Sequence, residues 1–94
     1  FDAMADGVAR SSVELAARAN LPERYVREGL GALATAGIVA IERDGRYALP
    51  QAHAALLARS GEMPMASSFQ FVAELGTVET RIVNCFHSGG GVPY

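Results

Sequence analysis

Side chains that could act as nucleophiles, bases or metal ligands are widely separated in this sequence. The one cysteine, Cys85, has no basic neighbour and lies in an apolar pattern, which favours a buried, inert thiol over a nucleophile. His53 has no second histidine, cysteine or carboxylate at a ligand spacing, so we expect no metal site there. We recognise no nucleophile–base pair and no metal-binding set, and we expect no catalytic residue.

The run Gly89-Gly90-Gly91 is the one segment whose composition could suit a phosphate. In a phosphate-binding loop, a strand precedes the glycines and a helix beginning with Lys and Ser or Thr follows them. Neither is present, so we favour a flexible hinge toward a following domain. His87, just before this run, is typical of a helix C-terminus, where the helix dipole favours it.

DNA binding is the second chemistry that the sequence could support. Residues 21–49 contain four arginines and four acidic residues, which cancel in charge: Arg24, Arg27, Arg43 and Arg46 against Glu23, Glu28, Glu42 and Asp44. Affinity for DNA comes largely from the neutralisation of phosphates by basic side chains. The whole chain has a net charge of −2. We therefore favour a solvated face or a protein contact, and keep DNA binding as the alternative.

Short helices and one hairpin would position these residues. Ser11 and Glu14 form a capping box before a helix over 12–19, and Pro22 suits the first position of a helix over 22–36. Asp44-Gly45 marks the turn of a hairpin over 38–49.

The register of this hairpin follows from its hydrophobic pattern. A three-residue loop with Gly45 left-handed places Ile41 opposite Tyr47 and Val39 opposite Leu49, with all four on one face. We expect a further short helix over 51–58.

A long amphipathic helix is predicted over 67–87. Its apolar side chains step by four and three residues, at Phe71, Leu75, Val78, Ile82 and Cys85. We call this row of apolar side chains the seam. The core that residues 8–49 can form is too small to cover it. We therefore predict a dimer interface at Phe71, Leu75, Val78 and Ile82. The surrounding Met65, Phe69 and Phe86 are explained by core packing or by a subunit interface, and the interface is favoured.

The size and composition allow one small domain. The chain has 94 residues, of which 50% are hydrophobic, and no apolar run approaches the length of about 18 residues that a membrane span needs. The predicted fold is mainly α with a small β-hairpin, a winged helix-turn-helix followed by a long C-terminal helix. We divide it into a winged helix-turn-helix domain (1–59), a linker (60–67) and a long helix with its glycine-rich hinge (68–94).

The order of these elements resembles a known family. The run SSVELAARANLPERYVREGLGALATAGIVAIERDGRYALPQAHAALL, then a long helix and FHSGGGVPY, resembles the N-terminal domain of bacterial S-adenosylmethionine-dependent methyltransferases. The resemblance implies a cytoplasmic, dimerising and substrate-covering domain that precedes a Rossmann-like catalytic domain. It also implies that His87, Ser88 and Tyr94 lie beside the substrate, and that S-adenosylmethionine binds to the catalytic domain.

One departure from the family limits what the chain can do alone. The glycine-rich cofactor loop that follows a strand in such enzymes has no counterpart here. We therefore expect the chain to be part of a longer protein and to transfer no methyl group by itself. The alternative is a winged-helix transcription regulator that reads DNA with residues 22–36.

Overall fold

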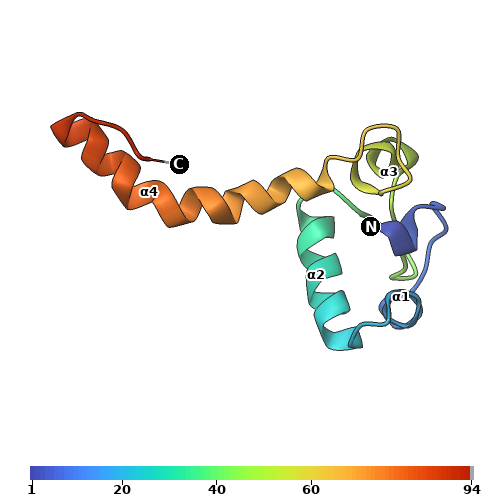
Figure 1. The fold of residues 1–94 in the computed structure, drawn as a ribbon. Helices are drawn as coiled ribbons and strands as arrows, with labels where there is room; N and C mark the ends of the chain where they lie inside the picture. Colours follow the sequence, from blue (N-terminus) through green and yellow to red (C-terminus); the bar gives the residue numbers. More distant parts are fainter. Residues whose placement is uncertain (94) are drawn as a thin grey trace.

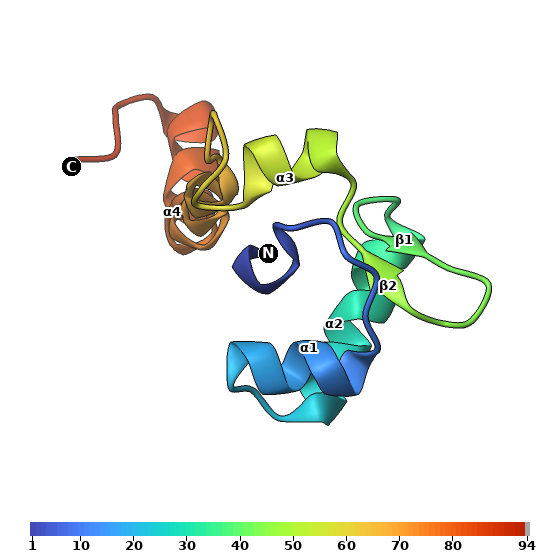
Figure 2. The ribbon, with the colours of Figure 1, turned by 90° about the vertical axis from the view of Figure 1, so that its right-hand side faces the viewer.

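The computed structural model describes residues 1–93 and shows a small, mainly helical domain from which one long helix projects (Figure 1). Two short strands form an antiparallel hairpin beside the helices (Figure 2). In chain order the elements are the 3₁₀ helix η1 (Asp2–Met4), α1 (Ser12–Ala19), α2 (Glu23–Thr35), β1 (Ala40–Ile41), β2 (Tyr47–Ala48), α3 (Gln51–Leu57), the 3₁₀ helix η2 (Ala66–Phe69) and α4 (Gln70–Ser88). This order confirms the predicted winged helix-turn-helix and its long C-terminal helix.

The first helix of the helix-turn-helix begins and ends as its local sequence predicts. The Ser11 hydroxyl accepts the backbone N–H of Glu14 at 3.2 Å, and the Glu14 carboxylate accepts the backbone N–H of Ser11 at 2.7 Å. This reciprocal pair satisfies two N–H groups that have no partner within the helix. The backbone N–H of Ser11, and then its hydroxyl, lower the pKa of Glu14. Asn20 ends α1 in the left-handed conformation, with φ of 54°.

A Schellman motif ends α2 and turns the chain toward the hairpin. Gly37 has φ of 72°, a conformation in which a side chain is disfavoured. Its N–H donates to the Ala34 carbonyl at 3.0 Å, and the N–H of Ile38 donates to the Leu33 carbonyl at 2.9 Å.

The hairpin has the predicted register. Ile41 pairs with Tyr47, and Gly45 is left-handed with φ of 81°. The structure adds a pairing that was not predicted, because Arg10 forms an isolated antiparallel bridge with Tyr47, with N–H···O distances of 3.0 and 2.8 Å. This bridge joins the segment before α1 to the outer side of β2 without forming a third strand.

The core lies where η1, the first two helices, the hairpin and α3 meet. Six buried side chains form it: Met4, Leu15, Leu30, Val39, Leu49 and Ala54. His53 ties α3 to the wing, because its Nδ1 atom lies 2.7 Å from the carbonyl oxygen of Ile38. All the parts of the winged domain thus share one core.

The long helix α4 leaves this core and has no buried residue. The molecule measures 56 × 29 × 24 Å and has a radius of gyration of 17.7 Å. A compact domain of this length would have a radius of gyration of about 12 Å. In the part of the chain that the structure describes, no helix is both long and apolar enough to cross a membrane.

Candidate protein interface on the long helix

The predicted seam of α4 faces solvent over its N-terminal half. Phe71 and Leu75 are 68% and 62% exposed, Val78 is half-buried, and Ile82 is 37% exposed. A side chain of this type gains about 1.5–3 kcal/mol when it is buried. An exposed row of such side chains is typical of a surface that contacts another protein.

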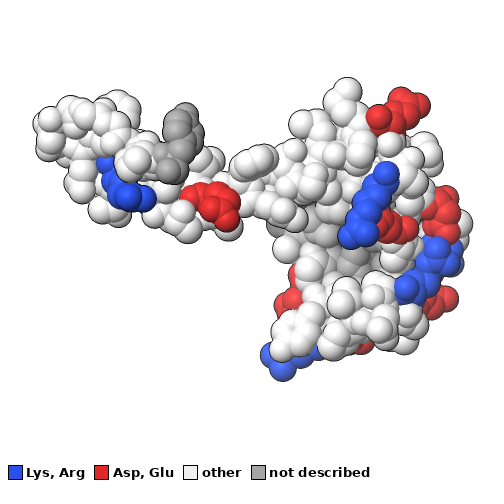
Figure 3. All heavy atoms as spheres, in the orientation of Figure 1, with Lys and Arg blue, Asp and Glu red and all other residues white. Residues whose placement is uncertain are grey.

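Further apolar side chains widen this surface beyond the predicted seam. Val72 and Val83 lie beside the seam along α4 and are 66% and 47% exposed. The aromatic side chains at the two ends, Phe69 and Phe86, are also exposed, as is Met65. Packing in the core therefore does not explain these residues. The space-filling view shows few charged side chains along α4 (Figure 3).

The segment after α4 folds back beside the C-terminal end of the seam. Gly89 and Gly90 have φ of 73° and 98°, and the chain turns back along the helix (Figure 1). Ile82, Cys85, Phe86, Gly91 and Val92 line a small, mostly apolar hollow there. Cys85 was predicted to be buried, and the structure shows that it is only half-buried, because the core does not extend to α4.

The residues expected to lie beside a substrate have no common site in the described structure. His87 and Ser88 are exposed on the last turn of α4, and neither lines the hollow around Cys85. Tyr94 lies outside the described residues. No group of three or more potential metal ligands (His, Cys, Asp or Glu) occurs within residues 1–93.

The face that would read DNA is exposed but electrically balanced. All four of its arginines, Arg24, Arg27, Arg43 and Arg46, are exposed. Two of them face acidic neighbours, at 3.7 Å from Arg27 to Glu23 and at 2.7 Å from Arg46 to Asp44. The backbone N–H of Arg46, and then its guanidinium, lower the pKa of Asp44. Positive and negative side chains alternate over the winged domain (Figure 3).

Three ion pairs at the N-terminal segment were not predicted from the sequence. Asp6 receives two bonds of 2.7 Å from Arg10, Asp2 lies 3.3 Å from Arg59, and Arg18 lies 3.5 Å from Asp6. The first pair has the spacing of four residues that signals helical ion pairs, but it spans a loop. The second joins residues at opposite ends of the domain, which no local pattern shows.

Together, the turn between α1 and α2, the hairpin and the shared core define a winged helix-turn-helix domain. Residues 1–59 match the Rv2258c-like winged HTH domain, and the chain belongs to this family.

One solved structure extends the similarity beyond the winged domain. The structure described as PigF with SAH matches 89% of this chain at 28% sequence identity, with a TM-score of 0.74. The chain spans about a quarter of that protein, since the match covers 26% of its length. No curated protein matches the chain.

Proposed function

We propose that this chain is the accessory N-terminal part of a bacterial S-adenosylmethionine-dependent methyltransferase, and that it is not catalytic alone. One observation carries the proposal: the similarity to PigF with SAH covers the projecting helix as well as the winged domain. SAH, S-adenosylhomocysteine, is what remains of S-adenosylmethionine once its methyl group has been transferred. The cofactor would bind to the catalytic part of the protein, in the cytoplasm.

The proposal includes two roles for the chain. The first is to form a homodimer through Phe71, Leu75, Val78 and Ile82 of α4, which the exposure of Phe71 and Leu75 supports. The second is to cover the substrate of the adjoining catalytic domain with His87, Ser88 and Tyr94, at the junction between the two parts. The first role needs only a second copy of this chain, whereas the second needs the catalytic domain.

The coding sequence beyond residue 94 provides the first test. We expect a strand followed by a Gly-x-Gly loop, with an acidic residue about 20 positions further on, since this pattern holds the cofactor in such enzymes. A following sequence that contains no strand with such a glycine-rich loop would contradict the proposal.

Calorimetric titration with S-adenosylhomocysteine provides the second test. The 94-residue chain should give no binding heat, whereas the longer protein should bind. Saturable binding by the 94-residue chain would show that the cofactor site lies within it, against the proposal.

The alternative of a DNA-reading regulator has weaker support. The winged helix-turn-helix fold is shared with DNA-binding proteins. However, Arg27 and Arg46 are each paired with an acidic side chain, which reduces the positive charge available to phosphates.

A further inference from the structure

The segment between α3 and α4 is folded against the end of α3 (Figure 1). From the sequence it was predicted to be a linker over 60–67. In the structure, residues 58–65 turn over the C-terminus of α3 before the chain continues into η2 and α4. This segment decides how α4 is oriented relative to the winged domain.

Two backbone hydrogen bonds attach the segment to α3, and a third closes a turn within the segment. The N–H of Gly61 donates to Ala58 at 2.9 Å, that of Met63 to Ala55 at 3.0 Å, and that of Met65 to Leu56 at 2.7 Å. The last carbonyls of a helix have no partner within the helix, so they need one from outside. Here Met63 and Met65 supply N–H groups to two of these carbonyls, and the segment caps α3.

Gly61 is the residue that allows this close approach. A Cβ atom there would overlap the carbonyl oxygen of Ala55 and lie 2.7 Å from that of Ala54. The backbone of Gly61 is not left-handed, so the need for glycine comes from space and not from φ. Any side chain at this position would push the segment away from α3.

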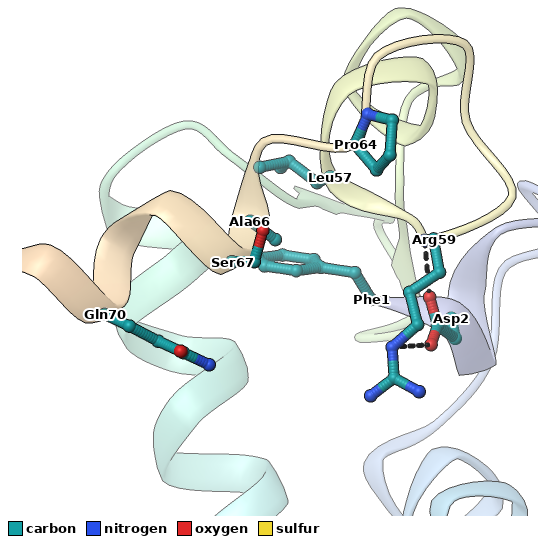
Figure 4. A pocket seen from close by; sticks show the side chains of 8 residues that line it. All are labelled: Phe1, Asp2, Leu57, Arg59, Pro64, Ala66, Ser67 and Gln70. Carbon is teal, nitrogen blue, oxygen red and sulfur yellow. Dashed lines mark hydrogen bonds and ion pairs between the residues drawn. The ribbon is translucent and has the colours of Figure 1, made fainter.

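The two ends of the segment are also anchored. Asp2 accepts the N–H of Arg59 at 2.8 Å and lies 3.3 Å from its Nε atom (Figure 4). At the other end, the N–H of Ser68 donates to the carbonyl of Met65 at 2.9 Å. The helix η2 begins directly after Met65, at Ala66, and continues into α4. Arg59, Met63 and Met65 are therefore each bonded to a residue outside the segment, and Gly61, which closes the turn with Ala58, lies between the first two.

We propose that residues 58–65 form a rigid elbow, closed by Gly61, that holds α4 in one direction relative to the winged domain. A partner on α4 and any molecule against the winged domain would then have a fixed relative position. The elbow does not depend on the proposed methyltransferase role, because only contacts within this chain form it.

Nuclear magnetic resonance of the 94-residue chain tests the elbow directly. Residual dipolar couplings from residues 8–57 and from α4 should fit one common alignment tensor. The amides of Met63 and Met65 should exchange with solvent at least ten times more slowly than in an unstructured peptide. Two different tensors, or unprotected amides at Met63 and Met65, would overturn the proposal.

A pair of glycine variants isolates the role of Gly61. In Gly61→Val, exchange at Met63 and Met65 should accelerate at least tenfold while the Leu15 and Leu30 amides stay protected. Gly29→Val is the matched control, because a Cβ added at Gly29 would meet no atom within 4 Å. In this variant, the amides of Met63 and Met65 should exchange at the wild-type rate. Unchanged protection in Gly61→Val would contradict the proposal, and the wild-type couplings test it even if that variant fails to fold.

Discussion

Among single residues, Asp6 has the most strongly altered ionisation. The guanidinium of Arg10 donates two hydrogen bonds to it, and the N–H of Val8 donates a third at 3.1 Å. Arg10, and then the N–H of Val8, hold the pKa of Asp6 well below its ordinary value of 3.8. Because the native pKa is lower than the unfolded one, ionised Asp6 stabilises the fold above about pH 4. This stabilisation is lost as the pH falls toward the native pKa.

Asp6→Asn should therefore lower the melting temperature at pH 7, and the difference from wild type should shrink as the pH falls below about 4. Thermal melts followed by circular dichroism between pH 7 and pH 2 measure it. Glu62→Gln, at an exposed carboxylate for which residues 1–93 provide no ion pair, is the control and should match wild type throughout. A difference for Asp6→Asn that stays constant down to pH 2 would show that ionisation is not its cause.

Gly45 tests the loop of the hairpin. An added Cβ would meet nothing within 4 Å, so the cost of a side chain comes from φ of 81° alone. We expect Gly45→Val to lower the free energy of unfolding by about 1 kcal/mol or more, and Arg43→Ala to be nearly neutral. Urea denaturation measures both, and equal effects would mean that the left-handed turn does not matter.

The elements were predictable from the sequence wherever their signals are local. The capping box of α1, the Schellman end of α2 and the turn at Gly45 each involve residues only a few positions apart. The pairing of Arg10 with Tyr47 and the bond from Arg59 to Asp2 join distant residues through the tertiary fold, so no local pattern shows them. The seam of α4 was predictable from its period, but the backbone hydrogen bonds of the elbow leave no signature in side-chain types.

The charge balance of α2 and the hairpin leads to a prediction about DNA. With Arg27 and Arg46 paired to acidic side chains, few arginines remain to neutralise phosphates. We expect random duplex DNA to bind with a dissociation constant above about 100 μM at physiological salt, the weak end of non-specific binding. Fluorescence anisotropy of a labelled duplex measures it. Salt-sensitive binding at low micromolar protein would favour the regulator alternative.

At the scale of the whole molecule, the projecting helix presents an apolar face to solvent. Its exposed apolar face has no cover from the winged domain, because the elbow directs α4 away from the core. Burying side chains such as Phe71 and Leu75 is worth several kcal/mol in total, at about 1.5–3 kcal/mol each. In the proposed dimer a second copy of α4 supplies this cover, and a two-fold pair presents the same face from both chains.

Leu75→Glu with Val78→Glu should abolish this dimer, because carboxylates would be buried without partners in its interface. Sedimentation velocity should give the wild type at twice the chain mass and the double variant at one chain mass. Thr77→Glu with Asn84→Glu is the matched control, since it adds the same charge to the polar side of α4 and should leave the dimer intact. The winged domain should stay folded in both variants, with the Leu15 and Leu30 amides protected, because α4 contributes no residue to its core. A wild-type chain that is monomeric at high micromolar concentration would refute self-pairing, and the apolar face would then be assigned to the adjoining catalytic domain.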